Sequence, residues 1–204
     1  IDHCLVGSEM CIRDSISDSS YDENKRWPDG LSPFGFKVVK EMNKQGVMID
    51  ISHVSDAAFM KVLELSKAPV VATHSSLRHF TPGWERNVSD EMLIALAENG
   101  GVIQLCFGSD FVANRKDNPD IEVSVKNVVD HIDRVRDLVG IDHVGFGSDF
   151  DGEVPLPEDI NDVSKFPNLI EELLIRGYTE SEIDKILNEN ILRVWKEVRA
   201  LADA

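Results

Sequence analysis

Cysteine is scarce in this sequence. Only three cysteines occur among 204 residues, at Cys4, Cys11 and Cys106. Three scattered thiols are too few for a disulfide framework, and they cannot form a thiolate cage for zinc. Any metal that the chain binds must therefore be held by histidine and carboxylate side chains.

Basic residues and long apolar runs are also in short supply. The 21 lysines and arginines stand against 37 aspartates and glutamates, which gives a formal net charge of −16. Nucleic acids and anionic lipids attract basic surfaces, so neither is predicted as the main partner. No apolar run approaches the roughly 20 residues of a membrane helix, so no transmembrane segment is expected. The 42% of hydrophobic residues still suffices for a folded core.

The amino terminus has no initiator methionine. Residues 1–16 read IDHCLVGSEMCIRDSI and show neither a signal-peptide apolar core nor a periodic pattern. The stretch CLVGSEMCIRDS is similar to translated sequencing adapter. We therefore expect residues 1–16 to be foreign, give His3, Cys4 and Cys11 no role, and take residues 17–204 as the natural domain.

Strands and helices alternate over the rest of the chain. Four separated strands predict parallel βα units with right-handed crossovers, as in a (β/α)₈ barrel or a doubly wound sheet. No G-x-G-x-x-G follows a strand, which disfavours a dinucleotide-binding sheet. Four units are half of the eight that a closed barrel needs. The predicted strands are 47–51, 70–73, 102–107 and 143–147. Three helices are predicted to begin after Ser32, Ser55 and Ser89, and further helices are predicted at about 125–138, 163–176 and 190–201. A capping box, Thr179/Glu182, is predicted to open another helical segment between the last two.

Polar side chains follow three of these strands. His53 and His74 come just after two successive strands, and Asp149 follows the fourth. In parallel barrels the carboxyl ends of the strands carry the active site. Neighbouring strands lie roughly 4.8 Å apart, so two such imidazoles can meet on one ion, zinc or a similar divalent metal, at about 2.0–2.1 Å per bond. The alternative for each histidine is a hydrogen-bonded structural role.

Further candidates lie in the same loops. Arg86 either clamps a carboxylate with two hydrogen bonds or forms a surface salt bridge. Asp151 competes with Asp149 for any acid–base role. Three glycines after the fourth strand weakly suggest a phosphate cradle, without the lysine or helix start that would support one; they are Gly145, Gly147 and Gly152.

The other histidines and the remaining thiol are expected to be structural. His131 lies off the apolar stripe of its helix and is predicted to be solvated, and His143 opens a strand at its amino end. His79 lies in a loop without an identifiable partner, and Cys106 is predicted to be an inert core thiol. In the last helix the predicted core residues are Leu192, Val194, Trp195 and Val198.

Six motifs then occur in order from about Ile16 to the end of the chain. They are GLSPFG at 30–35, IDISHVS at 49–55, THSS at 73–76, RNV at 86–88, VGFGSDFDG at 144–152 and NILRV at 190–194. Together they closely resemble the membrane (renal) dipeptidase family. The resemblance implies a (β/α)₈ barrel with two zinc ions bridged by a glutamate, which hydrolyses dipeptides and related small amides.

The resemblance also implies roles for four residues. His53 and His74 fall on the two histidine ligands of one zinc, and Arg86 falls on the arginine that holds the substrate carboxylate. Asp149 falls on the aspartate near the metals that handles the proton and contacts substrate. A homodimer is compatible with this resemblance.

Three elements of the family pattern have no counterpart here. They are an early His-x-Asp pair for the other zinc, the bridging glutamate, and a substrate-contacting histidine just upstream of 17–20. The resemblance therefore implies the carboxyl-terminal half of a zinc-dependent dipeptidase barrel, with four βα units and carboxyl-terminal helices, inactive by itself. The alternatives are a non-catalytic barrel homologue with a binding or scaffold role, and a phosphate-binding barrel.

Overall fold

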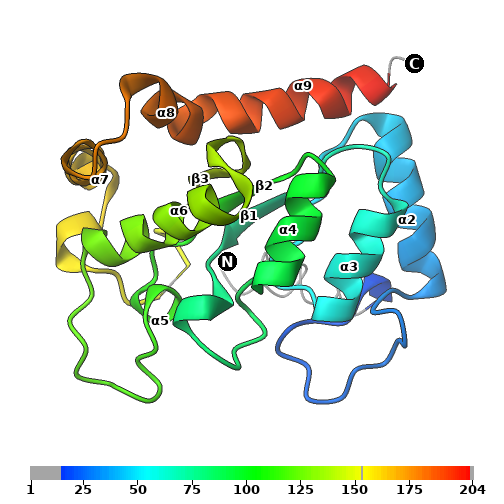
Figure 1. Ribbon diagram of the computed structural model, residues 1–204. Coiled ribbons are helices and arrows are strands. Elements are labelled where there is room, and N and C mark those ends of the chain that lie inside the picture. Colours follow the sequence, from blue (N-terminus) through cyan, green and yellow to red (C-terminus); the bar gives the residue numbers. More distant parts are fainter. Residues whose placement is uncertain (1–14, 153, 203–204) are drawn as a thin grey trace.

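A small parallel sheet lies at the centre of the computed structural model, which describes residues 15–152 and 154–202 (Figure 1). Strands β1 (Val71–Ser75), β2 (Val102–Leu105) and β3 (Val144–Phe146) pair in that order. These correspond to three of the four predicted strands. Such an α/β fold is consistent with part of a barrel. The residues His3, Cys4 and Cys11 lie outside the described residues.

The first predicted strand, 47–51, forms one parallel bridge only. Asp50 pairs with Val71, and two backbone hydrogen bonds flank this bridge: Ile51 N–H to Val71 O at 2.9 Å and Val71 N–H to Ile49 O at 3.0 Å. The ladder ends there because His53, two residues later, takes a left-handed backbone conformation with φ 68°. The segment is nevertheless aligned with β1, as the sequence predicted.

The helices begin and end at the predicted signals. Ser32 accepts a hydrogen bond from Gly35 N–H at 2.9 Å, and Gly46 ends that helix in the left-handed conformation. The Thr179/Glu182 capping box is present. The α-helices are α2 (Pro33–Gln45), α3 (Asp56–Leu65), α4 (Asp90–Glu98), α5 (Ser109–Val112), α6 (Val125–Val139), α7 (Phe166–Ile175), α8 (Glu180–Asp184) and α9 (Asn190–Ala202), with a π-helical turn, Lys185–Glu189, joining the last two.

Helices cover both faces of the sheet. Helices α2, α3, α4 and α6 stand in a row in front of it, whereas α9 runs along one edge of the molecule (Figure 1). Consecutive residues of a strand point to opposite faces. Accordingly Val71 and Val102 pack with Val194 and Val198 of α9, and Ala72 and Ile103 belong to the larger core under the other helices.

Helix α9 is fixed to the amino ends of the strands. Asn190 donates to the carbonyl oxygens of Ile141 and Val144, both at 2.8 Å, and Arg193 donates to Gly100 O at 2.8 Å. The carboxyl ends of the strands, and the loops that follow them, therefore face away from α9. No helix in the described part of the chain is both long and apolar enough to cross a membrane.

Two predictions about buried residues are wrong. His131, predicted to be solvated, is fully buried, because its helix packs against α5 and the loop after β1 as well as against the sheet. Leu192 and Trp195, predicted in the core, are 43% and 46% exposed, since the face of α9 that meets the sheet is the one with Val194 and Val198.

The carboxyl ends of β1 and β3 converge at Gly147, although β2 lies between these strands. Gly147 N–H donates to Leu105 O at 3.0 Å, and a Cβ atom at Gly147 would lie 1.8 Å from Thr73 O. The register of β1 against β2 shifts between Ala72 and Ser75, so Thr73 lies at an irregularity of this strand. The absence of a side chain at Gly147 thus permits strong curvature of the sheet.

We expect Gly147→Ala to lower the free energy of unfolding by about 3 kcal/mol, because the methyl group would overlap a backbone carbonyl. The matched control is Gly83→Ala. Gly83 has φ 79° and open space where its Cβ would lie, so that change should cost only about 1 kcal/mol of backbone strain. Urea unfolding of both variants measures the difference, and equal losses would contradict the close approach.

Candidate active site

His53 and His74 meet at the carboxyl end of the sheet. His74 lies in β1, and His53 follows the segment bridged to β1. Their Nε2 atoms are 2.8 Å apart and their ring centroids 4.8 Å apart. Both side chains are partly exposed. The structure thus brings together the two histidines that the sequence predicted as a pair.

The backbone of His53 is held by the segment near the start of the described chain. Ser20 N–H and Ser19 Oγ–H both donate to His53 O, at 2.9 and 3.2 Å. That segment is in turn fixed by the buried Asp18, which accepts Arg26 N–H and Trp27 N–H at 2.9 Å each. The left-handed conformation at His53 is therefore supported by its surroundings, as strained functional residues require.

A hydrogen-bond chain fixes the ring of His74. The hydroxyl of Thr73 donates its one proton to Asp50 Oδ2 at 2.6 Å, and its oxygen lies 2.7 Å from His74 Nδ1. The Thr73 oxygen must therefore accept from His74, so Nδ1 carries the proton and Nε2 presents its lone pair. Asp50 Oδ1 also accepts Ser52 N–H and Thr73 N–H, at 2.9 and 3.0 Å.

The two imidazoles fit part of a zinc site. Arg86 Nη2, which can only donate, lies 3.1 Å from His53 Nε2, so this nitrogen is unprotonated and its lone pair accepts from Arg86. Two nitrogen ligands on one tetrahedral zinc lie about 3.3 Å apart, given bonds of 2.0–2.1 Å, slightly more than the 2.8 Å found here. Within residues 15–152 and 154–202, no three His, Cys, Asp or Glu side chains are grouped closely enough to hold a metal ion.

Arg86 is buried beside this pair, with 3% of its surface exposed. Its Nη1 donates to Ser75 Oγ at 2.8 Å, its Nη2 donates to His74 O at 2.5 Å, and its guanidinium lies 5.3 Å from the centre of the Phe111 ring. The alternative of a surface salt bridge is therefore wrong. The buried Nε–H of Arg86 has no hydrogen-bond partner among the described residues.

Burial also affects the pKa of Arg86. Desolvation lowers the pKa of its guanidinium from the usual range, and the negative charges of groups including Asp149 and Asp50 oppose this effect. Arginine stays protonated in proteins even so. A buried positive charge with an available N–H is the arrangement that an anionic ligand group would stabilise.

Asp149 begins a tight turn after β3. It has φ 60°, and its carbonyl accepts Gly152 N–H at 3.0 Å. A Cβ atom at Gly152 would lie 2.4 Å from Asp149 Oδ1, so this glycine leaves room for the carboxylate. Asp149 Oδ2 lies 3.8 Å from Cys106 Sγ. Asp151, in contrast, is exposed in the turn, and which carboxylate handles a proton stays a prediction.

Cys106 and His143 take the structural positions that the sequence predicted. Cys106 is buried, and burial raises the pKa of its thiol to about 12, which keeps it in the unreactive protonated form. His143 Nδ1 lies 2.8 Å from Gly101 O at the amino end of the sheet. His79 is exposed and packs edge-on against Phe80.

The polar residues that orient the histidines were missed from the sequence. Asp50 and Thr73 fix the ring of His74, Ser52 Oγ accepts His74 N–H at 3.1 Å, and Ser75 holds Arg86. A signal existed at Asp50, which interrupts the apolar run VMIDI, a costly position for an unpartnered carboxylate. Ser52, Thr73 and Ser75 carry no comparable signal, because short hydroxyl side chains are common in strands and loops.

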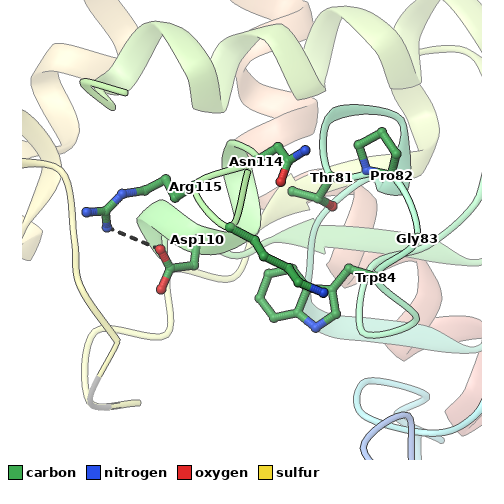
Figure 2. A pocket seen from close by; sticks show the side chains of 8 residues that line it. Thr81, Pro82, Gly83, Trp84, Asp110, Asn114 and Arg115 are labelled. Carbon is green, nitrogen blue, oxygen red and sulfur yellow. Dashed lines mark hydrogen bonds and ion pairs between the residues drawn. The ribbon is translucent and has the colours of Figure 1, made fainter. Parts of the chain in front are cut away.

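A cavity of about 530 Å³ lies outside this histidine pair, between the loop after β1 and the end of α5 (Figure 2). The ring of Trp84 stacks on Phe111 with centroids 4.7 Å apart and planes inclined by 7°. Asp110 and Arg115 face each other across 3.1 Å in an ion pair. The remaining lining residues are Thr81, Pro82, Gly83, Asn114 and Lys116.

Comparison with known proteins identifies the family. The model of the membrane dipeptidases, peptidase family M19, matches residues 9–204. The chain belongs to this family. The resemblance that the motifs around His53, His74, Arg86 and Asp149 suggested is thus confirmed over residues 9–204.

Solved structures of similar proteins agree with this membership. The probable dipeptidase PvdM from Pseudomonas aeruginosa is 30% identical, with a TM-score of 0.83 over 92% of this chain and 60% of that one. A metallo peptidase from Rhodobacter sphaeroides, liganded with a phosphinate mimic of L-Ala-D-Ala, is 35% identical, with a TM-score of 0.77 over 83% and 48%. An amidohydrolase from P. aeruginosa is 30% identical, with a TM-score of 0.78 over 91% and 61%. This M19 chain spans about half to three fifths of their length.

The hydrogen bond between Thr73 and His74 predicts a measurable tautomer. In the 204-residue chain, ¹⁵N spectra of the imidazoles should show His74 protonated at Nδ1, because Nδ1 donates to the Thr73 oxygen. Thr73→Val, which keeps the side-chain shape, should shift the proton toward Nε2. Thr179→Val, at a distant helix cap, should leave His74 unchanged. Protonation of His74 at Nε2 in the unaltered chain would contradict the assignment.

Proposed function

We propose that this chain is the carboxyl-terminal half of a (β/α)₈ barrel whose complete form is a zinc-dependent dipeptidase. The observation that carries the proposal is the convergence of the His53 and His74 Nε2 atoms at 2.8 Å, with the His74 lone pair oriented by Thr73 and Asp50. Buried or oriented imidazole pairs with a carboxylate behind them are typical of metal ligands and their supporting residues.

His53 and His74 would then hold one of two zinc ions. The remaining ligands would come from the part of the barrel that this chain does not contain, through the His-x-Asp pair and the bridging glutamate that family resemblance implies. When bound, zinc supplies a Lewis acid and a water molecule that ionises near neutral pH. The membrane dipeptidase match and the metallo peptidase neighbour support this assignment.

Arg86 would anchor the free carboxylate of a dipeptide. Its guanidinium lies next to His53, and its Nε–H is a buried donor with no protein partner in the described structure. An arginine can bind a carboxylate with two parallel hydrogen bonds, which fixes the orientation of the substrate. A single arginine placed beside the metal ligands would thereby favour short substrates whose carboxylate is near the scissile bond.

Asp149 would hold and move the proton. Its carboxylate lies at the rim of the sheet in a turn that Gly152 makes possible, and its negative charge acts to raise the pKa of Arg86. Asp149 is partly buried whereas Asp151 is exposed, and a proton shuttle must lie within about 2.6–3.2 Å of its target. Asp149 would therefore deliver a proton to the leaving amine, and Asp151 would serve the turn.

The two alternative functions are less well supported. Gly147 and Gly152 have packing roles against Thr73 O and the Asp149 carboxylate, which explains both without a phosphate. A non-catalytic scaffold would have no need for an oriented imidazole pair beside a buried arginine. The substrate class proposed is a dipeptide, in keeping with the L-Ala-D-Ala mimic bound by the R. sphaeroides neighbour. A homodimer stays a prediction.

The first test measures zinc. In the full-length protein, His53→Ala combined with His74→Ala should remove one of two zinc ions per chain, as counted by elemental analysis of dialysed protein. The control is His143→Ala, because His143 contacts Gly101 O at the opposite end of the sheet and should leave both ions bound. Unchanged zinc in the double variant would assign both histidines a structural role.

The 204-residue chain alone should release no amino acids from alanyl-alanine.

The second test separates the two aspartates. In the full-length enzyme, Asp149→Asn should keep zinc and fold but lower kcat by on the order of 10²–10⁴, the usual contribution of a general acid–base group. Asp151→Asn should cost much less, because its side chain is exposed in the turn. Steady-state kinetics with alanyl-alanine decide between them. Near-normal kcat in Asp149→Asn with loss of activity in Asp151→Asn would reverse the assignment.

A further inference from the structure

Three separate segments meet at the buried ring of His131. This ring lies in α6 with none of its surface exposed. The backbone N–H of Leu77, in the loop after β1, donates to Nδ1 at 3.0 Å, and Nε2 lies 3.1 Å from the carbonyl of Val112 at the end of α5. The ring of Phe80 packs on it, with centroids 4.3 Å apart.

The two contacts require one particular form of the ring. Nδ1 accepts from a backbone N–H, so the proton must be on Nε2, where it is donated to Val112 O. The ring is therefore neutral. Burial lowers the pKa of His131 to about 4, and the nearby His79 acts in the same direction, so this neutral form persists through the physiological range. A leucine at this position would leave one buried donor and one buried acceptor unpartnered.

These contacts lie at the base of the loop that carries Arg86. Leu77 is bridged in parallel to Val88, with Arg78 N–H donating to Val88 O at 2.8 Å. Asn87, next to Arg86, donates to Phe111 O at 2.8 Å. His131 and Asn87 thus tie the same loop to two consecutive carbonyl groups of α5.

Arg86 lies next to the hydrogen bonds that join this loop to α5. Its guanidinium lies over the Phe111 ring at 5.3 Å, while Phe111 and Val112 are the residues whose carbonyl groups are held. A shift of α5 relative to the loop would therefore move the surface on which the guanidinium rests. Helix α6 also packs against α5 and this loop through apolar side chains, and His131 adds side-chain hydrogen bonds from α6 to both the loop and α5.

We propose that His131 is a positioning residue, which sets the place of the Arg86 guanidinium by fixing α5 against the loop after β1. The part of the proposal that concerns substrate rests on the proposed function, because it assumes that Arg86 binds the dipeptide carboxylate. The part that concerns the position of Arg86 depends on the fold alone.

The direct test observes Arg86 in the 204-residue chain. The buried Nε–H of Arg86 should give a resolved, slowly exchanging ¹H–¹⁵N signal. His131→Leu should shift this signal and speed its exchange about tenfold or more, and His131→Asn, which keeps an acceptor for Leu77 N–H, should do so less. The matched control is Val135→Ala, which opens a cavity on the same buried face of α6 and should leave the signal in place. If His131→Leu does not fold, the Arg86 signal of His131→Asn is compared with that of Val135→Ala instead.

The second test uses the full-length enzyme. His131→Leu should raise KM for alanyl-alanine about tenfold with kcat changed less than about twofold, and should leave KM for the carboxamide of the same dipeptide unchanged. A purely structural role would instead lower the amount of active enzyme and leave both KM values alone, as expected for Val135→Ala.

The outcomes separate the two proposals. An unmoved Arg86 signal in the His131 variants would overturn the positioning role whatever the kinetics. Suppose that Arg86→Met raises KM for alanyl-alanine but not for its carboxamide. A shifted Arg86 signal in His131→Leu without the same selective rise in KM would then also overturn the positioning role. If Arg86→Met leaves KM unchanged, the assigned role of Arg86 in the proposed function is wrong, and the signal of Arg86 still decides whether His131 positions it.

Discussion

The hydrogen bonds from Asp50 through Thr73 to His74 fix the orientation of one of the two imidazoles that meet at the carboxyl end of this sheet. A neutral imidazole has one donor and one acceptor, and only the acceptor can ligate a metal. Because the Thr73 hydroxyl gives its proton to Asp50, the His74 ring must turn its own proton away from His53. The same Asp50 carboxylate joins the first bridged segment to β1, so one side chain fixes both the sheet edge and the ring.

Two sets of contacts set the positions of the polar groups around His53 and His74: the close approach of β1 and β3, and the hydrogen bonds that hold the loop with Arg86. At Gly147 the ends of β1 and β3 approach so closely that no side chain fits, which brings the Asp149 turn toward the histidines' strand. From the other side, hydrogen bonds of His131 and Asn87 hold the loop with Arg86. The charged groups of Arg86 and Asp149 therefore come from loops, while their spacing is set by contacts in the sheet and in α5.

Much of this arrangement could be predicted from the sequence, and the exceptions share a physical cause. Strand positions, caps and the His53/His74 pair follow from local patterns, because capping and period are properties of short segments. The burial of His131 could not be read from its helix, since the contacts that satisfy it come from residues 54 and 19 positions away in the chain. Similarly, residue reasoning alone left Arg86 open between a carboxylate clamp and a surface salt bridge, because its partners Ser75 and Phe111 have no sequence signature.

The π-helical turn Lys185–Glu189 has a consequence for the whole carboxyl-terminal region. Such a turn holds one residue more than an α-helical turn would, and each residue of an α-helix advances the side-chain direction by about 100°. It thereby sets the phase of α9 relative to α8: Asn190 points at the carbonyl groups of Ile141 and Val144, and Val194 falls on the sheet. Loss of a single residue from this turn would rotate α9 about its axis, and the exposed face that carries Trp195 would compete for the apolar surface of β1 and β2.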